Sequence, residues 1–237
     1  MHQSKQGKKE AVQSMFDAIA GKYDFLNHFL SAGIDHSWRK KVAKIVAHEK
    51  PASVLDVATG TADLAIAVSR RTKAKITGID ISAGMLQVGN RKLEQKTLQH
   101  QISLIQADSE RIPFETNSFD VSMVAFGVRN FEDLHEGLSE MHRVTRQGGL
   151  IVVLEFSKPR KFPVKQLYLF YFRNILPTLG RLISKDRGAY TYLPDSVGQF
   201  PDGRHFLNEL ERSGFTQVTE RRLTFGIASI YTGRKNN

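Results

Sequence analysis

The chain of 237 residues contains no cysteine, and this absence removes several kinds of chemistry at once. Disulfide bonds, thiolate metal sites and a cysteine nucleophile are all excluded. The eight histidines are scattered without the spacing of metal ligands, so we expect no metal centre. No run of about 18 apolar residues is present to span a bilayer. The basic first residues also lack the apolar core of a secretory signal, and we predict a cytoplasmic protein.

Positive charge, in contrast, is abundant. The chain has 34 lysine and arginine residues against 24 aspartate and glutamate residues, which gives a net charge of +10 and a pI near 9.8. Such a chain is attracted to anionic partners such as nucleic acids, phosphorylated ligands or acidic lipid surfaces. The length and the apolar share of 41% predict a single globular domain over residues 1–237.

Apolar periodicity divides this domain into three parts. Residues 1–50 have helical spacing and predict a cap of about three short helices, in which we expect the first nine residues to be unstructured. Residues 51–157 alternate strands and helices, which is typical of the α/β class with a doubly wound, mostly parallel sheet. Residues 158–237 add an aromatic stretch, a helix at 206–213 and a closing antiparallel hairpin. The predicted sheet has seven strands, at 53–57, 75–79, 102–106, 119–125, 150–155, 216–222 and 227–233, with helices at 62–71, 83–95 and 133–144.

The stretch VLDVATGTADLA, Val54 to Ala65, predicts a strand, a small-residue turn and a helix, the unit on which nucleotide-type ligands rest. A dinucleotide fingerprint needs three glycines, and only Gly60 is present, with Ala58 and Asp63 at the other two positions. No lysine follows the turn, so a P-loop is absent as well. These features favour an adenosyl ligand without phosphates, such as S-adenosylmethionine. The alternative is the first strand and helix of any parallel sheet.

Acidic residues end the next two strands. Asp80 stands 20 residues after Gly60, where a carboxylate accepts hydrogen bonds from ribose hydroxyls. Asp108 and Ser109 follow the third strand, where a carboxylate can accept from the adenine amino group. The alternative for Asp80 is chance, because acidic residues are common at strand ends, and the alternative for Asp108 is a turn or helix-cap residue. Together they would line one crevice, which is much less frequent by chance.

Several motifs then resemble the class I S-adenosylmethionine-dependent methyltransferases. They are DVATGT at 56–61, GIDISAGML at 78–86 and ADSERIPF at 107–114. Two longer stretches are similar to the C-methyltransferase family of menaquinone and ubiquinone biosynthesis: YDFLNHFLSAGIDHSW at 23–38, and RVTRQGGLIVVLEFSKP at 143–159 with FGVRN before it at 126–130. The resemblance runs from about Phe16 to Gly233.

This resemblance implies a Rossmann-like fold, S-adenosylmethionine as the methyl donor, no metal, and C-methylation of a prenylated quinol. Demethylmenaquinol is the first expected acceptor, and the benzoquinol of ubiquinone synthesis stays open. Ala58 and Thr59 stand where several relatives carry Gly-Gly or Cys-Cys, so the backbone contacts of the cofactor stay open too. For Met85, core packing is the alternative to a contact with adenine. The expected cofactor residues are Asp56, Gly60, Thr61, Asp80, Met85, Asp108 and Ser109.

Methylation of a ring carbon needs an electron-rich quinol held in line with the sulfonium methyl group, and a route for protons from oxygen and carbon. Arg129 and Asn130 end the fourth strand, where an acceptor-facing group belongs. Arg129 could stabilise a quinolate or order a water that acts as base, and a structural salt bridge is its alternative. Tyr23 and His36 in the cap are further catalytic candidates, with simple packing as their alternative.

Two other classes of protein compete with this hypothesis. A nucleic-acid methyltransferase would also explain the positive charge. However, FGVRN replaces the Pro-Pro turn typical of base N-methylation, and C5-methylation of pyrimidines needs a cysteine. We therefore expect no nucleic-acid partner. A non-catalytic binding module is the second rival, and the oligomeric state stays open.

Aromatic and apolar residues are concentrated at 167–183, and basic residues flank this segment. This pattern predicts a pocket for a polyprenyl chain and peripheral contact with an anionic membrane surface. A core helix beneath a solvated basic rim is the alternative. The flanking residues are Lys158, Arg160, Lys161, Lys165, Arg181 and Lys185.

The membrane contact is testable with vesicles. We expect the protein to sediment with anionic liposomes at low salt and to be released as salt is added, because exposed charges are screened over about 10 Å at 0.1 M. Liposome sedimentation measures this, with uncharged vesicles as the control. An absence of binding to anionic vesicles at low salt would contradict the expectation.

Overall fold

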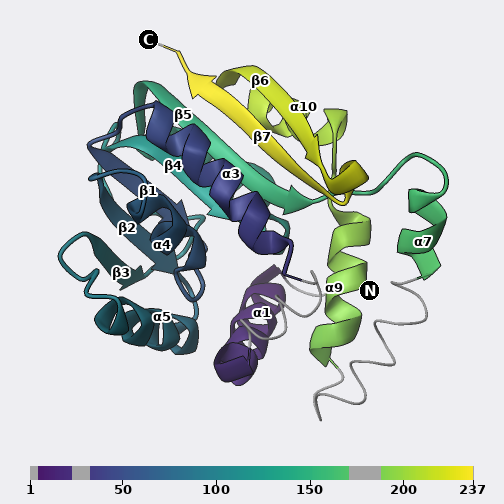
Figure 1. Ribbon diagram of the computed structural model, residues 1–237, viewed down its shortest axis with the longest axis horizontal. Coiled ribbons are helices and arrows are strands. Elements are labelled where there is room, and N and C mark those ends of the chain that lie inside the picture. The colour runs from purple at the N-terminus through teal and green to yellow at the C-terminus, as the bar shows by residue number, and fades with distance from the viewer. Residues whose placement is uncertain (1–4, 23–32, 171–187, 237) are drawn as a thin grey trace.

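The computed structural model describes residues 5–22, 33–170 and 188–236, whose strands form one seven-stranded sheet of order β3-β2-β1-β4-β5-β7-β6 (Figure 1). Strands β1 to β5 are parallel, and β7 is antiparallel to both β5 and β6. The expected doubly wound sheet with a closing antiparallel hairpin is confirmed. The strands are β1 (Ser53–Val57), β2 (Lys75–Asp80), β3 (Ile102–Gln106), β4 (Phe119–Ala125), β5 (Thr145–Phe156), β6 (Phe215–Leu223) and β7 (Ala228–Lys235).

Side-chain caps fix the start of two helices that border the site. The Ser82 hydroxyl accepts a hydrogen bond from the N–H of Met85 at the start of α5, and Asp133 accepts from two N–H groups at the start of α6. None of the described helices is long and apolar enough to cross a membrane. The helices are α1 (Lys5–Ile19), η1 (Ala20–Lys22), α3 (Asp35–His48), α4 (Asp63–Ser69), α5 (Ala83–Gln95), η2 (Val128–Asn130), α6 (Leu134–Val144), α7 (Val164–Phe170), α9 (Gly188–Gln199), α10 (Arg204–Arg212) and η4 (Thr224–Gly226).

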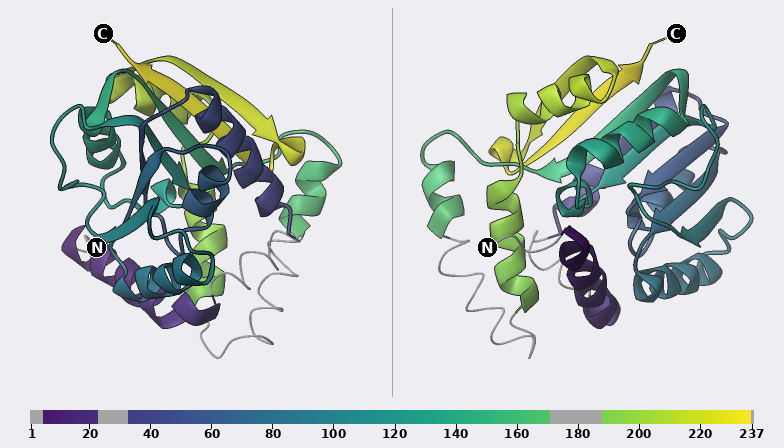
Figure 2. Two further views of the ribbon diagram at one scale, coloured as in Figure 1. Left: turned by 60° about the vertical axis from the view of Figure 1, so that its left-hand side comes forward. Right: turned by 180° about the vertical axis from the view of Figure 1, so that it is seen from behind.

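The sheet carries an apolar core on each face, with helices on both sides (Figure 2). Helices α3 and α4 contribute to one core, which contains Trp38 of α3 and Val54 of β1. Helices α6 and α10 contribute to the other, which contains Phe206 of α10 and Leu55 of the same strand. Successive strand residues point to opposite faces, so a strand such as β1, which has buried apolar residues on both faces, needs a helix layer on each side.

Three details differ from the expectations. Helix α1 begins at Lys5, so the expectation of an unstructured segment was wrong for residues 5–9, where Lys9 takes part in ion pairs. Strand β5 begins at Thr145 rather than Leu150, because an irregularity in its pairing with β4 absorbs the intervening residues. Helix α9, which contains Pro194, was not expected at all. Of the aromatic segment 167–183, residues 171–183 lie outside the described part.

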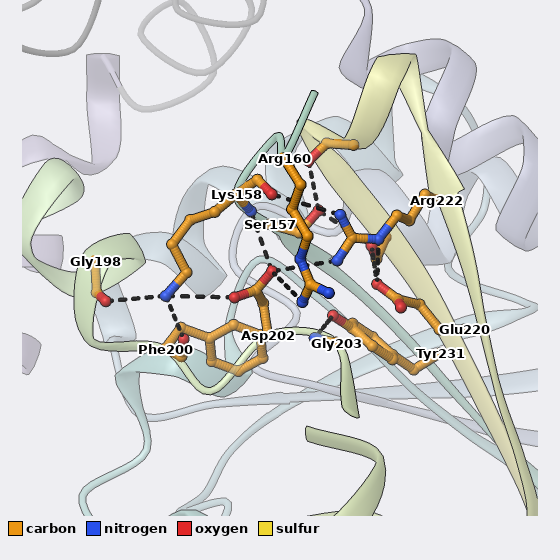
Figure 3. Close-up of polar contacts among 12 residues, drawn as sticks. Ser157, Lys158, Arg160, Gly198, Phe200, Asp202, Gly203, Glu220, Arg222 and Tyr231 are labelled. Carbon is orange, nitrogen blue, oxygen red and sulfur yellow. Dashed lines mark hydrogen bonds and ion pairs between the residues drawn. The ribbon is translucent and has the colours of Figure 1, made fainter. Parts of the chain in front are cut away.

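A polar network joins the C-terminal end of α9 to the chain that leaves β5 (Figure 3). The Lys158 ammonium donates to the carbonyl oxygens of Gly198 and Phe200, at 3.1 Å each. It also lies 3.3 Å from a carboxylate oxygen of Asp202, whose side chain is only 8% exposed. The Arg222 guanidinium of β6 lies 3.6 Å from the same carboxylate. The buried charge of Asp202 thus joins the segment after α9 to the segment after β5 and to β6.

We predict that Asp202→Asn destabilises the fold, because it removes the charge at the centre of this network and keeps the shape. When a mostly buried group loses a charged partner, the free energy of unfolding falls by about 1–3 kcal/mol. For a chain of this size this corresponds to a fall in Tm of roughly 2–10 °C. Thermal unfolding followed by circular dichroism measures it. The control is Glu211→Gln, which breaks an exposed pair with Arg204 and should change Tm little. Equal Tm values for the two variants would contradict the prediction.

Candidate active site

A cleft opens at the carboxyl ends of β1 to β4, beneath helix α1. Ligands of doubly wound sheets bind at this edge, where the strand order reverses between β1 and β4. Five of the seven expected cofactor residues line the cleft: Gly60, Asp80, Met85, Asp108 and Ser109. Segments far apart in the chain therefore meet at one place.

The turn after β1 has an unusual backbone. Ala58, Gly60 and Ala62 all have positive φ, at 50°, 57° and 66°. This region is unfavourable for alanine, and such strain persists where the surroundings enforce it. A Cβ added to Gly127 would lie 2.5 Å from the Cβ of Ala58. The end of β4 thus presses against the turn, and only glycine fits at residue 127.

Asp80 fixes the turn to the end of β2. Its carboxylate accepts from the N–H of Gly60 at 2.8 Å and from the N–H of Ser82 at 2.9 Å. Burial raises the pKa of Asp80, and these two hydrogen bonds oppose the rise. The carboxylate is therefore held in one position at the cleft wall.

Asp56 and Thr61, the other two expected cofactor residues, line a smaller cavity on the other side of the same turn. Asp56 is 1% exposed, and burial raises its pKa to about 7. One of its oxygens accepts from the Thr59 hydroxyl at 2.7 Å, and the other has no hydrogen-bond partner among the described residues. Arg39 of α3 lines the same cavity and is ion-paired with Asp35. A buried cation and a buried carboxylate thus share one small polar space.

Helix α1 closes the cleft from outside. The Lys9 ammonium donates to Asp108 at 2.5 Å and to Glu110 at 3.1 Å, in the loop after β3. About 12 Å further along the helix, at about 1.5 Å per residue, Asp17 accepts from the Ser82 hydroxyl at 2.5 Å and from the N–H of Gly84 at 3.0 Å. The helix is thereby fastened to the loops after β2 and β3.

Arg129 lies beside the cleft but does not line it. Its guanidinium donates to Glu155 at 2.9 Å and to the carbonyl oxygen of Phe126, and the side chain is 6% exposed against 0% for Glu155. Burial raises the pKa of Glu155, and the charge of Arg129 opposes the rise. This is the geometry of a structural ion pair between the ends of β4 and β5.

The remaining catalytic candidates lie in different places. Asn130 lines the cleft, and its side-chain oxygen accepts from the hydroxyl of Tyr192 in α9 at 2.9 Å. His36 is exposed in the first turn of α3 and is not among the described residues that line the cleft. Tyr23 lies outside the described residues.

Comparison with known proteins assigns this arrangement to a family. The sequence profile of the ubiE/COQ5 methyltransferase family matches residues 2–235. The chain belongs to the ubiE/COQ5 methyltransferase family.

Similar proteins of this family carry two kinds of name. The demethylmenaquinone methyltransferase of Bacteroides fragilis is 48% identical over 98% of this chain and 96% of its own length. The ubiquinone/menaquinone biosynthesis C-methyltransferase UbiE of Geotalea daltonii is 46% identical over 96% of this chain and 97% of its own. Nearly the whole chain is therefore shared with proteins named for quinone methylation.

A solved structure supports the fold. The S-adenosylmethionine-dependent methyltransferase of Thermotoga maritima, titled as a possible histamine N-methyltransferase, superposes with a TM-score of 0.66 over 94% of this chain and 99% of that one. The identity is only 14%, so the likeness concerns the fold alone.

Four residues of the site were not expected from the sequence. Glu155 could have been found, because it lies near the end of β5 and Arg129 shortly follows the end of β4, the parallel neighbour of β5. Lys9, Arg39 and Tyr192 had no such signal, since each reaches the site from a helix whose packing angle the sequence does not reveal. Among the described residues, no group of acidic and histidine side chains is arranged to hold a metal ion.

Proposed function

We propose that this chain transfers the methyl group of S-adenosylmethionine to a ring carbon of a prenylated quinol, and that demethylmenaquinol is the acceptor. The observation that carries the proposal is the 48% identity to a demethylmenaquinone methyltransferase over nearly the full length of both chains. Methylation of the benzoquinol of ubiquinone synthesis is the second candidate. It is favoured by the Geotalea daltonii relative, whose name covers both pathways.

The cleft supports a specific placement of the adenosyl group. Asp80 would accept hydrogen bonds from the ribose hydroxyls, as acidic residues at this strand end do. Asp108 and Ser109 would contact the edge of the adenine, and Met85, which is 2% exposed, would pack against its face. The sulfonium charge activates the methyl group by itself, so the proposed reaction needs no metal.

The smaller cavity supports a placement of the methionine end. This end carries an α-carboxylate and an α-ammonium group, and the cavity offers Arg39 and Asp56 as charges of opposite sign. The unpartnered oxygen of Asp56 would accept from the ammonium group. A buried carboxylate oxygen without a hydrogen bond is costly, and the ligand would supply the missing donor.

The acceptor then belongs above the end of β4. In the reaction, the quinol oxygen loses a proton, the ring carbon bonds to the methyl group, and the sulfur leaves as a neutral thioether. Loss of the proton on the methylated carbon and return of one to oxygen complete the reaction, with one proton released overall. Of the catalytic candidates Arg129, Asn130, Tyr23 and His36, Asn130 lines the cleft, and we assign it to the acceptor oxygen. Arg129 would hold the segment that carries it.

An apolar and basic end of the molecule supports the proposed contact with a prenylated substrate at a membrane surface. Phe162, just before α7, is 80% exposed, and Phe225 of η4 is 81% exposed. Figure 1 and both views of Figure 2 show α7 and the tip between β6 and β7 at the same end of the molecule. The exposed Lys161 and Lys165 lie in the same region of the chain. We propose a cytoplasmic protein that meets anionic lipid with this end.

The function is tested directly with quinones. Purified protein, reduced demethylmenaquinone and S-adenosylmethionine with a deuterated methyl group should give labelled menaquinone, detected by mass spectrometry. Cells that lack the protein should accumulate demethylmenaquinone. The control is Asp80→Asn, which should lower turnover by weakening the cofactor's ribose contact. An unchanged quinone pool would overturn the proposal, and accumulation of an unmethylated benzoquinone instead would favour the second candidate.

Cofactor binding should depend on pH through Asp56. Its pKa is about 7 without ligand, and an ammonium group beside it would lower that pKa. Binding below pH 7 then requires release of a proton, so Kd should fall about tenfold per pH unit up to about pH 7 and level off above it. Titration calorimetry across pH 5.5–8.5 measures this.

The matched variants for this measurement are two aspartates. Asp56→Asn should give a flat pH profile, with weaker binding above pH 7. Asp120→Asn, whose carboxylate contacts the N–H groups of Ala52 and Ser53 at the opposite edge of the sheet, should keep the wild-type profile. A profile of Asp56→Asn that equals the wild type would contradict the assignment.

A further inference from the structure

Asn130 is hydrogen-bonded to a residue that lies outside the cleft. Its Oδ1 accepts from the Tyr192 hydroxyl at 2.9 Å, across 62 residues of chain. Asn130 lines the cleft, whereas Tyr192 lines a separate cavity between α9 and the segment 128–134. The Tyr192–Asn130 hydrogen bond therefore connects the cavity beside α9 with the cleft.

The chemistry of the amide makes this contact decisive for what Asn130 can bind. A side-chain amide has two ends of nearly equal shape, of which the carbonyl oxygen accepts hydrogen bonds and the nitrogen donates two. The Tyr192 hydroxyl donates to the oxygen, so the amide hydrogens stay available to other partners. A tyrosine hydroxyl is protonated at neutral pH and able to donate, and burial raises the pKa of Tyr192 further.

The position of Tyr192 is itself fixed. Ser196, one helical turn further along α9 and on the same side, accepts from Nε of Arg129 at 3.3 Å. Arg129 is held in turn by Glu155, and the last carbonyl groups near the end of α9 are held by Lys158. Helix α9 therefore contacts two consecutive residues of η2, Arg129 and Asn130. These contacts leave the Tyr192 hydroxyl little freedom to move away from Asn130.

We propose that Tyr192 is a positioning residue, which orients the Asn130 amide so that its nitrogen, and not its oxygen, faces the acceptor oxygen. The inference rests on the proposed function. An N–H donor at this place stabilises the negative charge that forms on the quinol oxygen as its proton leaves. A carbonyl oxygen there would repel the same charge. Tyr192 itself gives up no proton in the reaction and touches neither substrate nor cofactor.

The test is a double-mutant cycle on kcat. Tyr192→Phe should lower kcat about tenfold, the scale expected for partial loss of one oxyanion donor, and should leave KM and the Kd of S-adenosylmethionine within about twofold. Asn130→Asp keeps the shape but cannot donate, and should lower kcat at least as far. If Tyr192 acts only through Asn130, the double variant Tyr192→Phe with Asn130→Ala should be no slower than Asn130→Ala alone.

The matched control removes another buried tyrosine hydroxyl. Tyr231 accepts from the N–H of Gly203 at 2.9 Å, away from the cleft (Figure 3). Tyr231→Phe should lower Tm and leave kcat unchanged. A wild-type kcat for Tyr192→Phe would overturn the proposal. So would a double variant in which the losses of Tyr192→Phe and Asn130→Ala multiply, or a loss of kcat for Tyr231→Phe that equals the loss for Tyr192→Phe.

A second readout does not depend on the acceptor. In ¹⁵N-labelled protein, the side-chain amide signals of Asn130 are those that vanish in Asn130→Asp. In Tyr192→Phe they should shift, and their hydrogen exchange should accelerate. Unshifted signals would overturn the positioning role. An inactive wild-type protein with shifted signals would count against the proposed function and not against the orientation of the amide by Tyr192.

Discussion

The acceptor side of the cleft depends on one buried ion pair, between Arg129 after β4 and Glu155 at the end of β5. Two neighbouring parallel strands end in opposite charges, and both side chains are removed from water. Such a pair contributes little net stability, but loss of one partner costs about 3–5 kcal/mol because the other charge stays buried. The pair therefore determines the path of the chain from Phe126 to Asn130.

Other parts of the site take their position from this pair. Arg129 also binds Ser196 of α9, and the adjacent Asn130 binds Tyr192. A helix near the end of the chain is thus docked on a segment near its middle. Gly127, in the same segment after β4, lies against Ala58 in the turn after β1. The segment therefore also borders the part of the cleft in which we place the cofactor. The Arg129–Glu155 pair thus links the two halves of the site.

Local pattern was sufficient to predict much of the fold. The bounds of β1, β3, β4 and α5 agree with those expected, because each is a run of clear period ended by a turn or cap. The residues at strand ends could also be grouped, since parallel strands bring their carboxyl ends to one edge. The family resemblance supplied what local pattern lacks, namely the chemical identity of the acceptor.

Long-range contacts could not be predicted in the same way. Lys9 meets Asp108 across 99 residues, and nothing in the basic N-terminal sequence distinguishes that lysine from its neighbours. Helix α9 contains a proline and a glycine near each end, which count against a helix, and its docking on η2 overrides that preference. Arg39 is buried on the same face of α3 as Trp38 and Val42, but helical spacing does not reveal that this face meets the turn after β1.

The fastening of α1 has a thermodynamic consequence for exchange of ligand. Asp108 forms part of the cleft wall and is also the anchor of Lys9, while Asp17 holds the loop that follows Asp80. A ligand that forms a hydrogen bond with Asp108 competes with Lys9. Ligand binding in the cleft and the attachment of α1 to the loop after β3 are therefore thermodynamically coupled. A ligand that binds Asp108 and the ion pair that holds α1 on the cleft therefore weaken each other.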